Sequence, residues 1–286
     1  MTIVGNDMSS IYRDMCKELR RYGLKVKVRG LYTVELIDTH IQLYDPKLRY
    51  VNFHARDMNM RYFIGELCHY LDARTDLASI AHYSQFWEKV SDDGKTINSA
   101  YGYRLFGLIP QVSSQIQFKY AIRCLEADAS SRKAVMTIYH PSDARESKDN
   151  PCTLNLQFLI RAEQLILITN MRSQDVWRGV PYDFAFFTLV QEIAWVILRR
   201  KYPELRLGPY YHNVASLHVY KEHYKGVDEV SEERDHNQIR SPEISDTDVD
   251  NWFDDLLTYE KSKRGTVLYK QESRRTLFQD WCKALL

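Results

Sequence analysis

The segment that most constrains the fold is residues 150–185, NPCTLNLQFLIRAEQLILITNMRSQDVWRGVPYDFA. Apolar and polar residues alternate over 154–158, a second apolar run covers 165–168, and the polar residues 161–164 separate the two. This pattern predicts two antiparallel strands joined as a hairpin. A largely apolar run then covers 181–199 and begins at a proline, which is favoured in a first helical turn. We expect a helix there that is buried on most sides.

Cys152 follows a proline within this segment and is the candidate nucleophile. A lone cysteine is most often a buried structural residue. A cationic neighbour such as Arg172 is expected to lower the pKa of the thiol, and the thiolate is the reactive form. The competing nucleophilic interpretation is a papain-like hydrolase with His140 or His212 as its base, but no cysteine-protease motif surrounds Cys152.

Together, the Pro-Cys pair, Arg172-Ser173-x-Asp175, the Gly-Val-Pro turn and residues 213–220 (NVASLHVY) resemble the thymidylate synthase superfamily. The last motif matches the family's Asp-x-His-x-Tyr sugar motif, with Ser216 in place of aspartate. Asp183 stands where thymidylate synthase has asparagine. That substitution resembles deoxycytidylate and cytidylate 5-hydroxymethylases more than thymidylate synthase itself. The resemblance covers roughly residues 24–225.

The resemblance implies an α/β (α+β) fold, with a large mixed β-sheet packed with helices and a homodimer joined through the sheet. Residues 1–225 are expected to form the catalytic domain, and 226–286 a charged loop and C-terminal helical extension of it. Within that extension we expect 222–247 to be a loop or partly ordered insertion. The remaining predicted elements are helices over 7–22, 58–73, 77–90, 111–127, 248–260 and 271–286, and strands over 24–38 (interrupted at 29–32), 134–139 and 205–220.

Several side chains match family positions that bind the nucleotide: Arg29, Tyr101, Arg132, Lys133, Arg172, Ser173, His218 and Tyr220. In the family, the Arg132 and Lys133 positions reach across the dimer interface to the partner's phosphate. Lys133 lacks the guanidinium fork and would contact phosphate only as a point charge. Without the surrounding motifs, both would be read as exposed basic residues at a strand start.

The resemblance also implies 5,10-methylenetetrahydrofolate as co-substrate. Asp175 would bond the pterin ring and Trp87 would form part of an aromatic wall over the folate. Glu66 matches the helix glutamate that organises active-site water and protons, although an isolated glutamate is ordinarily a surface residue. We expect no metal, because no zinc-ligand spacing is present.

Carbon 5 of a pyrimidine is a poor nucleophile, and addition of a thiolate at carbon 6 makes it enamine-like. Asp183 fits cytosine, because a carboxyl group can accept from the N4 amine and share a proton with N3. The alternative is an aspartate that only favours the helix dipole.

We therefore predict a 5-hydroxymethylase of dCMP or CMP, in which water adds to the exocyclic methylene left on carbon 5. The alternatives are a methylase of the thymidylate synthase type acting on dUMP or dCMP, and an inactive nucleotide-binding homologue. The sugar motif fits ribose and deoxyribose equally, since His218 and Tyr220 would contact the 3′ hydroxyl in either.

The 39 basic and 38 acidic residues nearly cancel, which gives no footprint for direct nucleic-acid or membrane binding. No apolar run reaches about 18 residues, and the N-terminus lacks the layout of a secretion signal. An odd number of cysteines without C-x-x-C spacing fits a reducing cytoplasm, bacterial or phage-infected. These cysteines are Cys16, Cys68, Cys124, Cys152 and Cys282.

Overall fold

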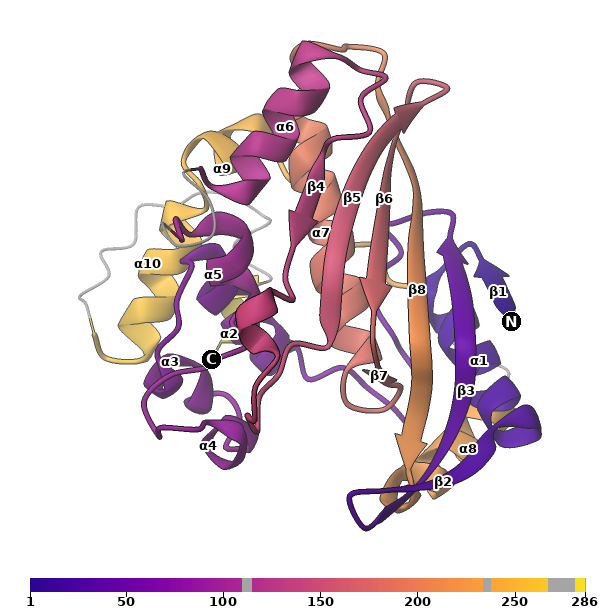
Figure 1. The fold of residues 1–286 in the computed structure, drawn as a ribbon. Coiled ribbons are helices and arrows are strands. Elements are labelled where there is room, and N and C mark those ends of the chain that lie inside the picture. Colours follow the sequence, from indigo (N-terminus) through magenta and orange to yellow (C-terminus); the bar gives the residue numbers. More distant parts are fainter. Residues whose placement is uncertain (110–114, 234–237, 267–280, 286) are drawn as a thin grey trace.

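The computed structural model describes residues 1–109, 115–233, 238–266 and 281–285. Its strands are β1 (Thr2–Gly5), β2 (Leu24–Val28), β3 (Leu31–Leu43), β4 (Val135–Thr137), β5 (Thr153–Arg161), β6 (Gln164–Met171), β7 (Gln174–Asp175) and β8 (Arg206–Tyr220). They form one eight-stranded mixed sheet in the order β1-β3-β8-β6-β5-β4, with β2 paired to β3 and β7 to β8 (Figure 1).

The described helices are α1 (Met8–Tyr22), α2 (Met60–Leu71), α3 (Leu77–Ala81), α4 (Phe86–Val90), α5 (Tyr101–Phe106), α6 (Gln117–Ala127), α7 (Val180–Leu198), α8 (Tyr224–Glu232), α9 (Asp246–Asp250) and α10 (Asp254–Lys263). Two short 3-10 turns, η1 (Pro141–Asp143) and η2 (Lys221–His223), complete the set. Along β6, buried residues alternate with half-buried ones, so one face of the sheet carries the core.

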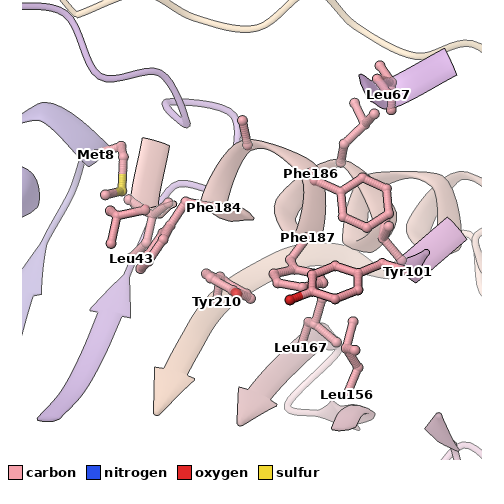
Figure 2. Close-up of a cluster of buried hydrophobic side chains, with 14 of the residues drawn as sticks. Met8, Leu43, Leu67, Tyr101, Leu156, Leu167, Phe184, Phe186, Phe187 and Tyr210 are labelled. Carbon is pink, nitrogen blue, oxygen red and sulfur yellow. The ribbon is translucent and has the colours of Figure 1, made fainter. Parts of the chain in front are cut away.

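Helix α7 forms the centre of the core. Phe184, Phe186 and Phe187 are each at most 2% exposed. Figure 2 shows Phe184 extending toward Leu43, while Phe186 and Phe187 lie beside Tyr101. Burying each such ring stabilises the fold by about 2–3 kcal/mol. By length and hydropathy α7 could cross a membrane, but 78% of its apolar window is buried inside the protein. The buried helix predicted over 181–199 is therefore confirmed.

The helix predicted over 7–22 is also confirmed, and Gly23 ends it for a steric reason. Its φ of −66° needs no glycine. A Cβ at this position would lie 2.4 Å from the Leu19 carbonyl oxygen and 2.1 Å from Val34 of β3. The last turn of the helix and the β3 strand therefore leave no room for a side chain at residue 23.

Three predicted elements differ from the structure. The helix expected over 77–90 is two short helices, α3 and α4, because the chain turns at residues 82–85. The stretch 222–247 contains α8, which packs against α1 and buries Val227 and Val230. Its many charged residues lie around this narrow apolar stripe and concealed the helical period. The helix expected over 248–260 is also two helices, α9 and α10, because the chain turns at residues 251–253. The interruption expected within the strand over 24–38 is confirmed, although the turn between β2 and β3 takes only Arg29 and Gly30.

Two predicted helices lie partly outside the described residues. Residues 110–114, at the start of the helix expected over 111–127, are not described, and α6 covers the remainder from Gln117. Most of the helix expected over 271–286 is likewise outside the described part, although Trp281 and Leu285 are buried. Upstream of it, α10 is tied to the turn between α3 and α4, because Tyr83 donates to Glu260 at 2.8 Å.

Candidate active site

Cys152 and Arg172 meet where β5 begins and β6 ends. Because these strands are antiparallel neighbours, residue 152 lies beside residue 172, and the Arg172 N–H donates to the Cys152 carbonyl at 2.9 Å. The guanidinium turns back along the chain and donates to the carbonyls of Pro151 at 2.8 Å and Asn150 at 2.9 Å. The Arg172 side chain thus holds the backbone just before Cys152 in place.

Ser173 links the two groups. Its hydroxyl lies 3.5 Å from the Cys152 sulfur and accepts from Arg172 Nη1 at 3.2 Å. Burial nevertheless raises the pKa of Cys152 above its usual value. Arg172 and Ser173 oppose that rise, whereas Asp183 adds to it. The expectation that Arg172 lowers the pKa is correct in sign, but burial outweighs it.

Tyr101 supports Cys152 from α5. Its hydroxyl accepts from the backbone N–H of Cys152 at 3.2 Å and of Thr153 at 3.3 Å. The ring stacks on Phe187, with centroids 6.2 Å apart. Tyr101 therefore joins the core helix to the backbone that presents the thiol.

Asp183 lies on the first turn of α7 and is held by Gln174, a residue that no predicted role covers. Gln174 Nε2 donates to Asp183 Oδ2 at 2.7 Å. Burial raises the pKa of Asp183 to about 6, and the Gln174 bond opposes the rise. Gln174 Oε1 is buried without a hydrogen-bond partner in the described part of the chain. The only signal for Gln174 was its place between Ser173 and Asp175.

Glu66 is buried on α2, so the surface interpretation of this glutamate is wrong. Its Oε1 accepts from the hydroxyl of Tyr62 at 2.6 Å and of Tyr70 at 3.2 Å. Trp87 Nε1 donates in turn to the Tyr62 oxygen at 3.2 Å. Burial raises the pKa of Glu66 to about 8, the phenols oppose the rise, and the charge of Asp183 adds to it.

Strand β7 places Asp175 directly opposite His218 of β8. Asp175 Oδ1 accepts from the backbone N–H of Trp177 at 2.8 Å and of Arg178 at 3.0 Å. The ring of Tyr220 meets His218 edge-on, with centroids 5.4 Å apart. These side chains therefore share the end of the sheet at which β6 runs into Arg172.

Ser216, which stands where the family motif has aspartate, has a carboxylate beside it. Its hydroxyl donates to Glu35 Oε2 at 2.6 Å, and Glu35 lies on β3 directly opposite His218. No sequence motif indicates Glu35, because only the strand register brings it to His218.

Three predicted phosphate ligands are not gathered around Cys152. Arg29 lies at the tip of the β2–β3 hairpin, beyond the end of β8 (Figure 1). Val135 pairs with Gln157, about 16 Å along β5 from Cys152 at the rise of a strand. Arg132 and Lys133 precede that pair, are exposed, and lie farther away still.

The histidines of the hydrolase alternative are engaged elsewhere. His212 is fully buried beside the Tyr210 hydroxyl at 2.7 Å, and burial lowers its pKa to about 3. His140 contacts the Thr137 carbonyl at 2.9 Å. Among the described residues, no group of three His, Cys, Asp or Glu side chains is arranged to hold a metal ion.

The sequence matches the thymidylate synthase family over residues 10–261. The chain belongs to the thymidylate synthase family. This confirms the family resemblance read from the Cys152, Arg172 and Asp175 motifs.

Three curated relatives include two proteins named hydroxymethyltransferase and one named thymidylate synthase. The chain is 28% identical over 233 residues to a deoxyuridylate hydroxymethyltransferase of Bacillus phage SP01, covering 78% of this chain and 60% of that protein. It is 27% identical over 218 residues to the deoxycytidylate 5-hydroxymethyltransferase of Enterobacteria phage T6, covering 73% and 85%. It is 25% identical over 171 residues to the thymidylate synthase of Bacillus licheniformis, covering 59% and 58%. The match thus spans about three fifths of the SP01 protein's length.

A solved structure confirms the fold. Thermostable thymidylate synthase A from Bacillus subtilis superimposes with a TM-score of 0.67 at 19% identity, covering 81% of this chain and 86% of that one. The predicted thymidylate synthase-like fold, a mixed sheet packed with helices, is therefore confirmed.

Proposed function

We propose that this member of the thymidylate synthase family is a pyrimidine nucleotide 5-hydroxymethylase that acts on dCMP or CMP. The observation that carries the proposal is Asp183, a half-buried carboxyl group whose charge acts on Cys152. The pKa of Asp183 itself is raised to about 6. Methylenetetrahydrofolate supplies the one-carbon unit when bound, and Trp87 and Asp175 are the residues we expect to hold it.

Cys152 is the nucleophile of the proposed reaction. Its thiolate adds to carbon 6 of the ring, which makes carbon 5 nucleophilic toward the one-carbon unit. Since burial raises the pKa of the thiol in the free protein, Arg172 and Ser173 are the groups that favour the thiolate. Tyr101 fixes the backbone from which the sulfur attacks.

Asp183 selects the base. Cytosine presents an acceptor at N3 and an amino donor at N4, so a carboxyl group with a pKa near 6 can share a proton with one and accept from the other. That proton would offset the negative charge that develops on the ring after thiolate attack. Gln174 holds one oxygen of Asp183 and so fixes the plane of the carboxyl group.

Glu66 is the residue we assign to the final step. Water addition to the exocyclic methylene needs a group that accepts a proton from the water. Two phage relatives bear the name hydroxymethyltransferase, one for deoxyuridylate and one for deoxycytidylate. Their names favour water addition but leave the base open, so the cytosine assignment rests on Asp183.

Arg132 and Lys133 contribute to the proposal only across a dimer. In one chain they stand too far along the sheet to reach a nucleotide on Cys152. In a homodimer packed through its sheets, each site would take its Arg132 and Lys133 from the partner. The Arg29 side chain, at a hairpin tip, would have to fold over the nucleotide to bind its phosphate.

The second candidate is a methylase that reduces the methylene by hydride from the folate. The similarity to a protein named thymidylate synthase, from Bacillus licheniformis, supports this candidate. The experiment is to incubate the protein and methylenetetrahydrofolate with CMP, dCMP, UMP or dUMP and to determine product masses. Our proposal requires hydroxymethylated cytosine nucleotide, absent with Cys152→Ser. A methylated uracil product would establish the second candidate, and no product with any nucleotide would favour an inactive homologue.

A further inference from the structure

Glu66 is the end point of a hydrogen-bond chain whose direction is fixed by chemistry. The indole N–H of Trp87 can only donate, and it points to the Tyr62 oxygen at 3.2 Å. Tyr62 therefore accepts there and must direct its own proton elsewhere. Its partner is Glu66 Oε1, at 2.6 Å.

The aromatic rings around Glu66 cannot easily turn away from it. Tyr62 meets Tyr182 of α7 edge-on, with centroids 4.8 Å apart. Tyr70, the second phenol on Oε1, packs against Phe186 of α7 at 4.7 Å. Both donors are thus clamped by the helix that carries Asp183, and both bonds fall on the same carboxylate oxygen.

We propose that Tyr62 is a positioning residue for Glu66: oriented by Trp87, its hydroxyl proton holds Oε1 and keeps Glu66 available as a proton acceptor. The inference deepens the proposed function and rests on it for the catalytic role of Glu66. The sequence motif does not include Tyr62, and only its place one helical turn before Glu66 connects the two.

The charges facing Glu66 determine the sign of the expected effect. Tyr62 and Tyr70 face it from α2 and lower its pKa, while Asp183 faces it from α7 and raises it. Because a hydrogen bond to the ionised form favours that form, removing the Tyr62 hydroxyl must raise the pKa of Glu66 further. The ionised glutamate, and any step that needs it, then appears only at higher pH.

The test compares Tyr62→Phe with Tyr83→Phe. Tyr83 donates to a different carboxylate, Glu260, at 2.8 Å, so its variant also removes one tyrosine-to-glutamate bond. The first readout is the pH at which the protonated carboxyl band of Glu66 disappears in the infrared spectrum of the ligand-free protein, assigned with Glu66→Gln. We expect Tyr62→Phe to raise that pH by about one unit, as for loss of a bond to a charged group, and Tyr83→Phe to leave it unchanged.

The second readout is the pH–rate profile, whose acid limb we expect Tyr62→Phe to move upward by the same amount. An unmoved infrared titration overturns the inference, whatever the enzyme's substrate. If the infrared titration of Glu66 shifts but the wild-type protein turns over no pyrimidine nucleotide, the proposed function is wrong. Tyr62 would still be the residue that lowers the pKa of Glu66. A moved titration with an unmoved rate profile overturns the catalytic part.

Discussion

The side-chain amide of Gln174 donates a 2.7 Å hydrogen bond to Oδ2 of Asp183, at the start of the core helix α7. Gln174 is buried and Asp183 is half-buried, so the bond is partly sheltered from competing water. One carboxyl oxygen of Asp183 is therefore already held by Gln174, and the carboxyl group stands where we propose that it hydrogen-bonds the pyrimidine base. The first prediction follows from this pair.

Asp183→Asn should lower turnover of cytosine nucleotides by about 10²-fold or more, because the amide cannot share a proton with N3. It should also improve relative binding of uracil nucleotides, whose O4 and N3–H match an amide. The measurement is kcat/KM on dCMP and dUMP, with Tyr182→Phe as the neighbouring control. An unmoved cytosine-to-uracil preference would make Asp183 only a helix-start residue.

Arg172 should control the reactivity of Cys152. Because its charge opposes the rise in the pKa of the thiol, Arg172→Gln should shift the pH dependence of Cys152 alkylation upward, and Arg172→Lys should shift it less. Peptide mapping by mass spectrometry separates Cys152 from the half-buried Cys124 and Cys282, which serve as internal controls. Identical Cys152 profiles in wild type and Arg172→Gln would remove Arg172 from the activation of the thiol.

Two inactive variants should restore activity when mixed, if each site draws Arg132 from the partner chain. A hybrid dimer of Cys152→Ser and Arg132→Ala chains contains one site with both residues intact. We therefore expect activity to recover on mixing under conditions that exchange subunits, measured by product mass. Mixing either variant with itself is the control. A protein that sediments as a monomer while active would contradict the shared site.

Glu66 should make the fold less stable as the pH rises. Its pKa is raised from 4.5 to about 8, so between these values the unfolded chain releases a proton that the folded protein keeps. The free energy of unfolding should then fall by up to about 1.4 kcal/mol per pH unit in this window. Glu66→Gln should remove that slope and stabilise the protein near pH 8, but not near pH 4. Urea denaturation across this range checks it, and identical slopes would contradict the buried ionisable role.

Local sequence patterns predicted the parts of the fold that depend on the spacing of apolar residues and on the residues that interrupt it. The hairpin around residues 161–164 and the apolar helix after Pro181 follow from residue spacing alone, and both occur as expected. Helix α8 was missed because charged residues outnumber Val227 and Val230, and its burial depends on docking against α1.

Site residues that lie within one sequence motif could be predicted. Those brought together by strand register or helix packing could not. Cys152 and Arg172 lie in one hairpin, so their proximity is local. Glu35 reaches His218 only through the pairing of β3 with β8. Tyr62 bonds Glu66 within α2, but Trp87 approaches them from a separate helix. Such contacts join segments that no sequence spacing relates.

The most direct test of the central claim is the fate of solvent oxygen in the reaction. The protein is incubated with dCMP or CMP and methylenetetrahydrofolate in water enriched in oxygen-18, and the nucleotide and folate products are analysed by mass spectrometry. Our account predicts a 5-hydroxymethylcytosine nucleotide that carries the label in its new hydroxyl group, together with tetrahydrofolate. A 5-methyl product without label, formed together with dihydrofolate, would contradict it.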